Sequence, residues 1–467
     1  MKTIQHFSFK VISLFLVSFL MITSCEREIS DEAVLATFSS NPEVFIDGFS
    51  SGLEYYPYLD SKFTAFSVDT ETKYQGSAAM RFDVPNEGDP EGAYAGAIFR
   101  DDNGGRDLSK YDALTFWAKS TKAATINEIG FGQDFGENKF QAHKKALRLT
   151  TNWVNYIIPL PIASKLTKES GMFWFSEGPE NGDGYSFWID ELKYEKLGTI
   201  AQPRPAIQNG QNINTDSYIG VNVQVAGLIQ TFNLASGLDE TLTISPNYFD
   251  FSSSDPSVAT VNESGSIDVL SDGATVITAK LGSLDASGSL QINSSGDFVL
   301  APTPTRPQED VISIFSDYYS SVPVDFFNGY WLPYQTTLSA DFNINGDQIL
   351  NYTNFNFVGN RFSNPTQDVS DKSNLHVNMY IPGEVPANFD FLITVVDFGP
   401  DQEDGGGDDT REQLFVRKSP KIVANEWITI ELPITLANKN NMGQIIYENI
   451  NFSSLRNVYL DNIYFYK

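Results

Sequence analysis

The chain has 467 residues, and its 59 Asp and Glu against 31 Lys and Arg give a formal net charge of −28. Such an acidic surface repels phosphate backbones and anionic lipid headgroups, which argues against nucleic acid as a partner. Apolar residues make up 41% and aromatic residues 13% of the chain, a composition that indicates a globular protein and excludes a disordered one.

The N-terminal segment predicts export. An apolar run from Val11 to Ile22 follows Lys2 and Lys10. The run is too short for a stable membrane-spanning helix and is typical of a secretory signal. Cys25 follows this run and is the only cysteine of the sequence, so an internal disulfide is excluded. An ordinary signal peptide with an incidental cysteine is the alternative to a functional Cys25.

The end of the apolar run, "ITSC", resembles the bacterial lipobox, in which the cysteine is acylated and becomes the mature N-terminus. The resemblance implies a signal peptide over residues 1–24, lipidation of Cys25 and a tether over residues 25–42. Acidic residues follow the cysteine at once, as they often do in Bacteroidetes lipoproteins displayed on the outer surface. The expected location is the outer membrane, with the protein held by its lipid anchor only and facing the cell exterior.

Two stretches rich in Pro, Gly and Ser divide the rest of the chain, Ala201–Gln211 and Asn293–Gln308. Such stretches usually act as stiff polar linkers. Elsewhere most segments alternate apolar and polar residues or carry short β-branched and aromatic runs, and helical periodicity is scarce. The predicted fold class is therefore all-β, with three modules over residues 43–198, 202–293 and 308–467.

The first and third modules share three blocks in the same order. In the first module these are "DLSKYDALTFWAKS", "TNWVNYIIPLP" and "YSFWIDELKYEK", and in the third they are "DVSDKSNLHVNMYIP", "NEWITIELPIT" and "NVYLDNIYFYK". This layout resembles the jelly-roll carbohydrate-binding modules, in which two antiparallel sheets pack face to face. The resemblance implies two jelly-roll β-sandwich modules, and chance agreement among β-rich sequences is the alternative.

A structural calcium ion is a further implication of that resemblance, because in such modules the ion often ties the N-terminal segment to the last strand. Calcium prefers several oxygen ligands. The candidate ligands are the aspartates near the start and in the closing strand of each module, namely Asp47, Asp190, Asp317 and Asp461. The alternative is that these carboxylates cap turns or lie in solvent.

The middle module contains the segment Phe251–Gly282, in which Asp255-Pro256 begins a turn and glycines permit reversals of the chain. The segment resembles the bacterial Ig-like domain of the group 2 type, which implies a β-sandwich spacer between the outer modules. Such domains also occur in bacterial adhesins, so a role in cell contact stays open.

The sequence has no constellation typical of an enzyme. Three His, at positions 6, 143 and 376, do not suffice for a hydrolytic triad or a His-rich zinc site. Paired carboxylates of the kind that glycosidases need were sought in Ile189–Glu195 and Asp401–Asp409. Strand alternation separates the acids of the first stretch, and the glycines of the second leave its carboxylates without preorganisation. No catalysis is expected, and a glycoside hydrolase that uses the acidic loop is the less favoured alternative.

Exposed rings and amides are the candidate ligand contacts, because sugars present apolar C–H faces edged by hydroxyl groups. Four of the six Trp lie in β runs and are interpreted as mostly core: Trp117, Trp153, Trp188 and Trp427. The other two lie in segments with Gly or Pro, as rings carried by loops do. The predicted ligand contacts are Trp331, Tyr330, Tyr334, Asn356, Arg361, Trp174 and Tyr56. The alternative is that these rings face the core and the amides face solvent.

The order of anchor, jelly roll, Ig-like spacer and jelly roll resembles the SusE-like surface glycan-binding lipoproteins of Bacteroidetes polysaccharide-utilisation systems. The resemblance implies capture of a neutral polysaccharide, preferably a β-1,3-glucan such as laminarin, for an outer-membrane importer of the SusC/SusD type. A surface adhesion or scaffold protein that binds other proteins is the alternative.

Overall fold

The computed structural model describes residues 38–136, 138–344, 346–416 and 421–467. It confirms the all-β fold class, because strands dominate and the helices of the described residues are short 3-10 turns. These turns are η1 (Phe63–Ala65), η2 (Ala163–Lys165), η3 (Gln208–Gly210), η4 (Pro246–Tyr248) and η5 (Gln308–Asp310). The predicted signal peptide, Cys25 and the tether up to residue 37 lie outside the described residues. Within the described residues no helix is long and apolar enough to cross a membrane.

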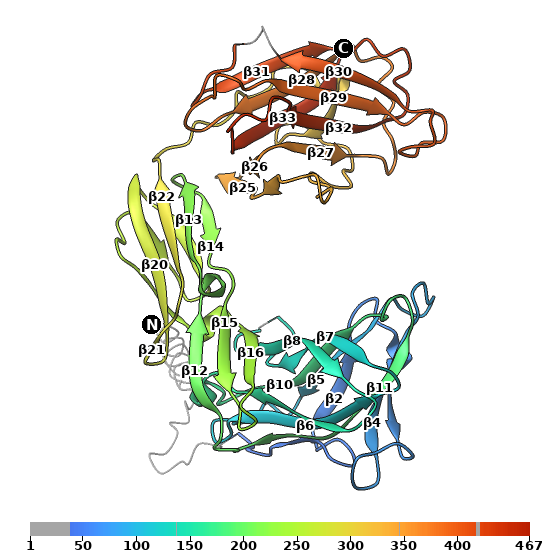
Figure 1. Cartoon of the computed structure of the whole chain (residues 1–467), viewed down its shortest axis with the longest axis vertical. Helices are drawn as coiled ribbons and strands as arrows, with labels where there is room; N and C mark the ends of the chain where they lie inside the picture. Colours follow the sequence, from blue (N-terminus) through green and yellow to red (C-terminus); the bar gives the residue numbers. More distant parts are fainter. Residues whose placement is uncertain (1–37, 137, 345, 417–420) are drawn as a thin grey trace, which may run out of the picture.

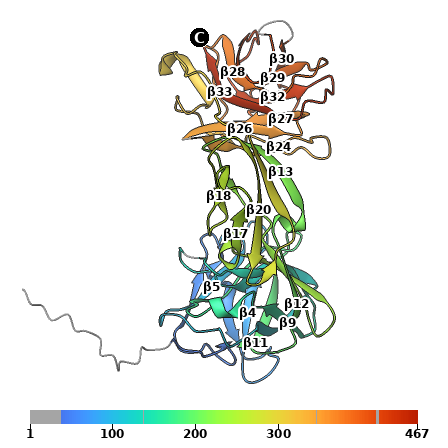
Figure 2. The same cartoon turned by 90° about the vertical axis from the view of Figure 1, so that its left-hand side faces the viewer.

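Three β-sandwich domains follow one another along the long axis of the molecule, from the blue N-terminal end to the red C-terminal end (Figures 1 and 2). The first domain has two facing sheets. One has six strands, β3 (Phe66–Asp69), β4 (Ala79–Val84), β11 (Tyr185–Glu195), β6 (Ala113–Ser120) and β9 (Val154–Pro159) in this order, with β1 (Glu43–Phe45) paired to β11.

The second sheet of the first domain continues beyond the expected module boundary. Its order is β12 (Ala201–Ala206), β15 (Ile229–Asn233), β16 (Asp239–Ile244), β8 (Ala142–Leu149), β7 (Ala124–Phe131), β10 (Gly171–Glu177), β5 (Ala95–Asp101) and β2 (Leu53–Pro57). The stretch that was expected to be a polar linker therefore forms strand β12 and pairs with β15. The first domain and the start of the middle domain share one sheet.

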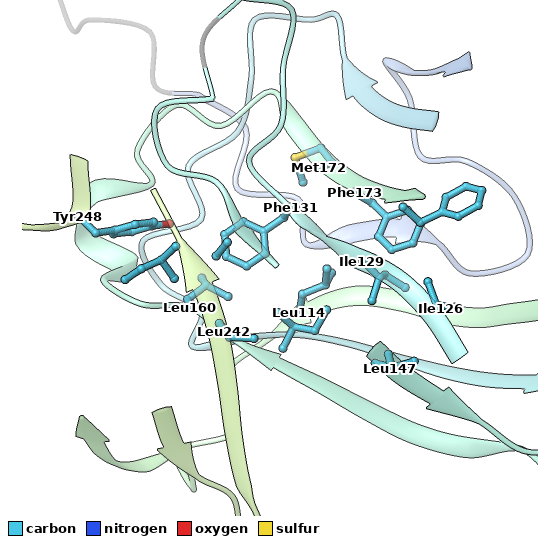
Figure 3. Packing of buried hydrophobic residues seen from close by; sticks show 14 of the residues in the cluster. Leu114, Ile126, Ile129, Phe131, Leu147, Leu160, Met172, Phe173, Leu242 and Tyr248 are labelled. Atoms are coloured by element: carbon cyan, nitrogen blue, oxygen red, sulfur yellow. The ribbon is translucent and has the colours of Figure 1, made fainter. Parts of the chain in front are cut away.

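Alternation of side chains places one face of each sheet in a common core. In β6, Leu114 and Phe116 face the core, whereas Trp117 and Lys119 face outward. Figure 3 shows that the core cluster also contains Leu242 and Tyr248, which follow the expected boundary in sequence. Burial of this continuous apolar surface therefore stabilises the junction of the first two domains as well as the first sandwich itself.

The middle domain has two small sheets of its own. One contains β13 (Asn212–Ser217), β22 (Ser289–Ser294), β20 (Gly273–Leu281) and β17 (Asp250–Ser253), with β21 (Leu284–Asp285) on β20. The other contains β14 (Asn222–Gln224), β19 (Ser266–Val269) and β18 (Ala259–Val261). Two facing sheets agree with a sandwich, and the Ig-like assignment stays a prediction.

The third domain again has two sheets. The larger contains β24 (Leu338–Ser339), β26 (Asp347–Thr353), β33 (Val458–Tyr466), β28 (Asn374–Tyr380) and β31 (Trp427–Pro433), with β23 (Val311–Phe315) on β33 and β25 (Phe342–Ile344) on β26. The smaller contains β27 (Phe357–Arg361), β32 (Met442–Asn449), β29 (Phe391–Asp397) and β30 (Thr410–Val416). A separate core cluster lies between them.

An aromatic cluster joins the middle domain to the third. Its rings are those of Tyr218, Phe298, Phe342, Tyr380, Trp427 and Tyr459. The Trp427 indole N–H donates a hydrogen bond of 2.6 Å to the Val299 carbonyl. Further along, the Arg306 guanidinium lies 3.6 Å from the centre of the Tyr466 ring. The second expected linker thus contacts the third domain at Val299 and Arg306.

Candidate functional site

The outer face of the smaller third-domain sheet carries a groove of about 620 Å³. The inward side chains of this sheet, such as Val358, Ile393 and Ile445, belong to the core, so the alternate residues face outward. The groove is lined by Trp331, Phe357, Thr394, Arg411, Gln413, Ile446 and Glu448.

Strand register brings these outward residues into rows across the sheet. Gly359 lies opposite Ile446, which lies opposite Thr394, which lies opposite Gln413. Because one row contains a glycine, an apolar side chain and two polar side chains, the groove has an apolar side and a polar side.

Trp331 forms the apolar wall. Its indole lies over Gly359, where a β-carbon would clash with the ring. The indole is stacked near Phe357, with ring centres 6.1 Å apart and planes inclined by 19°, and it meets Phe326 edge-on. Trp331 is thus half-buried and held against the sheet, as a ring that binds a sugar face needs to be.

Amide side chains fix the loop that carries Trp331. The Gln335 amide donates to Asn328 Oδ1 at 2.5 Å, and Trp331 N–H donates to Gln335 Oε1 at 3.2 Å. Asn356, one of the predicted ligand contacts, donates to the Tyr334 carbonyl at 2.9 Å and accepts from Thr336 N–H at 2.9 Å. The structure therefore uses the Asn356 amide to position the loop.

The other predicted contacts of this region lie around the groove and do not line it. Tyr330 and Tyr334 are exposed on the loop, the latter to 78%. The Arg361 guanidinium lies 3.6 Å from Asp404 and 5.1 Å from the centre of the Phe398 ring. The structure thus brings Trp331, Tyr330, Tyr334 and Arg361 to one side of the third domain, with Trp331 alone among them in the groove wall.

The polar side of the groove was not predicted. Arg411 lies 3.5 Å from Asp409 and 3.8 Å from Asp404, so the acidic loop is paired to it at the groove's end. Thr394 donates to Glu448 Oε2 at 3.4 Å, and burial raises the pKa of Glu448. The alternation of "TREQLFV" in β30 predicts the outward position of Arg411 and Gln413, because it puts both side chains on the face opposite to Leu414.

The corresponding face of the first domain contains Trp174 and Tyr56. The expectation that Trp174 is an exposed, loop-borne ring is wrong, because it lies within β10 and is only 3% exposed. Its indole N–H donates to the Phe131 carbonyl at 3.4 Å. Tyr56 lies at the edge of the same sheet, where its hydroxyl donates to Asp102 at 2.6 Å.

Two of the Trp residues that were expected in the core, Trp117 and Trp188, face away from it. Trp117 faces outward from the six-stranded sheet and stacks on Tyr74, with ring centres 3.9 Å apart and planes inclined by 11°. Trp188 also faces outward, between Arg81 and Lys119, although it is buried. The β runs were recognised correctly, but the sequence alone did not say which of their two faces was the core.

Backbone N–H groups already donate to the first-domain aspartates. Asp190 is fully buried, and its carboxylate accepts hydrogen bonds from the N–H groups of Tyr74 (2.7 Å), Gln75 (3.1 Å) and Glu191 (2.8 Å). Asp47 accepts hydrogen bonds from the N–H groups of Ser77 and Ala78, which lower the pKa of its carboxyl group. These donors stabilise the ionised carboxylates without a cation, and calcium in the first domain stays a prediction.

The third-domain aspartates differ in their electrostatics. Burial, with the nearby charges of Asp347 and Asp317, raises the pKa of Asp461 to about 7. One Asp461 oxygen accepts a hydrogen bond of 2.5 Å from Asn462 N–H. A cation beside these three carboxylates would relieve their mutual repulsion. Even so, no group of three or more His, Cys, Asp or Glu side chains within the described ranges is arranged to hold a metal ion.

Comparison with known proteins gives a family match for the first domain. Residues 35–196 match the family model described as carbohydrate binding domain 30. The match covers the first domain and supports a carbohydrate-binding module there. No curated protein matches the chain.

Solved structures that the chain resembles include further modules of this kind. The family 30 carbohydrate-binding module of the Clostridium thermocellum cellulosomal cellulase Cel9D-Cel44B is 19% identical, and the likeness covers 34% of this chain and 95% of that one at a TM-score of 0.23. The tandem CBM22-1–CBM22-2 domain of Paenibacillus barcinonensis Xyn10C is 10% identical over 93% of this chain and 99% of that one, at a TM-score of 0.24. A β-1,2-glucanase from Parabacteroides distasonis is 10% identical over 57% of this chain and 39% of that one, at a TM-score of 0.22.

Proposed function

We propose that the chain is a non-catalytic polysaccharide-binding protein and that the third-domain groove is its main binding site. The observation that carries the proposal is the groove itself, in which the fixed Trp331 ring faces Arg411, Gln413 and Glu448. An apolar wall opposite several hydrogen-bonding groups matches a sugar ring, which has C–H faces and a rim of hydroxyl groups. The family match of residues 35–196 supports glycan binding by the same chain.

The composition of the groove favours binding over hydrolysis. Glycosidases use two carboxyl groups on either side of the scissile bond. Among the described residues that line the groove, Glu448 is the one with a carboxyl group. The acidic loop contributes Asp404 and Asp409 to ion pairs with arginines, which engages those carboxylates. A glycoside hydrolase remains the less favoured alternative, and release of reducing sugar that Asp404→Asn abolishes would support it.

The finer proposal is a lipid-anchored protein of the outer membrane that captures a β-1,3-glucan such as laminarin for an importer of the SusC/SusD type. It is supported by the "ITSC" segment that ends at Cys25 and by the order of the modules in the sequence. With two glycan-binding domains on one chain, a long polymer gains avidity that a short oligosaccharide does not. A structural calcium ion in the third domain is part of the proposal, with Asp317 and Asp461 as candidate ligands beside backbone carbonyls. The repulsion that Asp317 and Asp347 exert on Asp461 favours a cation there.

Isothermal titration tests the binding proposal. The chain from Glu26 onward is titrated with laminarin and with other plant and algal polysaccharides, beside the variants Trp331→Ala and Tyr318→Ala. Tyr318 is an exposed ring outside the groove, so it controls for nonspecific loss of an aromatic residue. Binding that Trp331→Ala weakens and Tyr318→Ala keeps supports the proposal. A chain that binds none of the polysaccharides contradicts it and favours the adhesion alternative.

A further inference from the structure

A row of buried residues crosses the outward face of the larger first-domain sheet. Register pairs Tyr56 with Ile98, Ile98 with Trp174, Trp174 with Gly130 and Gly130 with His143. Their strand neighbours, such as Phe99, Phe173 and Ile129, belong to the core, so this row faces away from the core. Trp174 and His143 are nevertheless only 3% and 8% exposed. Something other than the core covers this row.

A bridge from edge strand β2 to the central strand β7 crosses part of this face. The Tyr58 hydroxyl, just after edge strand β2, forms a hydrogen bond with Gln133 Oε1, just after β7. Strands β5 and β10 lie between β2 and β7, so the bridge passes over the strand that carries Trp174. Gly96 leaves room for it, since a β-carbon there would lie 2.9 Å from the Tyr58 ring.

A second contact holds the same two segments together. The Phe135 ring meets Tyr56 edge-on with ring centres 4.8 Å apart. Arg100 of β5 forms an ion pair of 2.5 Å with Asp134, next to Phe135 in sequence. Because these contacts join short surface segments, they can open without unfolding of the sandwich.

His143, on the neighbouring strand β8, lies beside Trp174 with its hydrogen-bonding capacity unused. Neither ring nitrogen has a hydrogen-bond partner among the described residues, and Nε2 lies 3.7 Å from Glu128 Oε1. The charged groups that face it are Glu128 of β7 and Lys145, which lies two residues further along β8 and pairs with Glu128. A buried imidazole without partners is costly, and a neutral imidazole offers one donor and one acceptor. The ring of Trp174 lies beside it, with ring centres 5.2 Å apart.

We propose that His143 binds a sugar hydroxyl group in the first domain, next to Trp174, and that the Tyr58–Gln133 bridge must open before the sugar enters. The inference rests on the proposed function, since it assigns a residue and a gate to the second glycan-binding domain. A hydroxyl group fits because it donates to one imidazole nitrogen or accepts from the other, while the adjacent indole contacts the C–H face. The third-domain groove has its Trp331 half-buried and accessible, so the two domains differ in access.

Two variants with opposite expected effects test the inference. Both are made in the full chain from Glu26 onward that already carries Trp331→Ala, so that the binding measured is that of the first domain. Laminarin and mixed-linkage β-glucan are the probes. His143→Leu removes the hydrogen-bonding groups and is expected to weaken binding about tenfold. Tyr58→Phe removes the bridge and is expected to strengthen binding several-fold.

The outcomes separate the inference from the proposed function. Unchanged affinity in His143→Leu overturns the role of His143, and unchanged or weaker affinity in Tyr58→Phe overturns the gate. If the Trp331→Ala chain binds neither glucan, glycan binding by the first domain is contradicted and the inference falls with it, while wild-type binding still tests the third domain.

Nuclear magnetic resonance of the imidazoles checks the contact without a variant that alters folding. The chain from Glu26 onward has two histidines, His143 and His376, so labelled ring nitrogens give two sets of signals. Addition of a glucan that binds the Trp331→Ala chain is expected to shift the His143 signals. The His376 signals should stay unchanged, since that ring stacks on Tyr464 in the third domain. Unshifted His143 signals at saturation overturn the inference.

Discussion

The indole of Trp331 lies on Gly359, in a space that any β-carbon at position 359 would occupy. Gly359→Ala is therefore expected to displace the ring from the groove wall and to weaken glucan binding as strongly as Trp331→Ala does. The fold should tolerate the change, since a glycine in a strand gives no side-chain packing of its own. Titration with laminarin beside a thermal unfolding curve measures both effects.

Gly48→Ala is the matched control, because a β-carbon at position 48 meets nothing within 4 Å. It should leave third-domain binding unchanged. Unchanged glucan binding by Gly359→Ala would show that binding does not require the contact between the Trp331 ring and Gly359.

Asn356 should act on binding through the loop that it holds. Asn356→Ala removes hydrogen bonds to Tyr334 and Thr336 and is expected to cost about 1–3 kcal/mol in the free energy of unfolding. Affinity for laminarin should fall as well, since the loop that carries Trp331 loosens. Tyr334→Ala, on the exposed tip, should change the free energy of unfolding by less than about 0.5 kcal/mol. Denaturant unfolding and titration of both variants check this, and equal effects of the two would contradict the positioning role.

The stability of the third domain should fall as the pH rises. The pKa of Asp461 is raised from 3.8 to about 7 in the folded state. Between these values the folded state keeps a proton that the unfolded state has lost, so the free energy of unfolding decreases with rising pH across this window and levels off above it. Asp461→Asn should flatten that slope. Denaturant unfolding of both proteins at pH 5 and pH 8 measures it, and an unchanged slope would rule out Asp461 as its source.

Calcium should affect the third domain only. Millimolar calcium is expected to raise the unfolding temperature of the wild type, because the ion would offset the repulsion among Asp317, Asp347 and Asp461. Asp461→Asn should abolish the shift, whereas Asp190→Asn should keep it, since Asp190 is already satisfied by backbone N–H groups. Calorimetry with calcium and with a chelator checks the proposal. A calcium effect that depends on Asp190 would place the ion in the first domain instead.

The aromatic cluster between the middle and third domains should set the geometry of polymer binding. Phe298→Ala removes a central ring of this cluster and is expected to destabilise the junction, by less than the about 3–5 kcal/mol typical of a fully buried Phe because Phe298 is partly buried. The third domain should then move more freely, which small-angle X-ray scattering detects. Affinity for long laminarin should fall while affinity for short oligosaccharides stays the same. A parallel loss for both ligands would show that the ring supports the groove and not the domain arrangement.

Sequence patterns sufficed for the fold class and for one element of the site. Alternation and turn residues identified the strands, and the Gly- and Pro-interrupted "FNGYWLPYQ" marked Trp331 as a ring outside the regular strands. Trp174 is buried within β10, between β5 and β7, and this pairing with strands distant in sequence is not visible in the local pattern.

Two other differences have the same origin in long-range contacts. Asp190 is satisfied by the N–H of Tyr74, 116 residues earlier, which no motif predicts. Strand β12 was mistaken for a linker because its Pro and polar residues match a loop, whereas pairing with β15 decides its structure. The local composition of these segments does not specify their structure, which contacts with residues distant in sequence determine.

The central claim is that the third-domain groove binds a glucan through Trp331. Affinity gel electrophoresis tests it most directly, with the wild-type chain from Glu26 onward, Trp331→Ala and Tyr318→Ala run side by side in gels with and without laminarin. The account predicts that laminarin retards the wild type and Tyr318→Ala and retards Trp331→Ala much less. Equal retardation of all three proteins, or no retardation of the wild type by any polysaccharide, would contradict it.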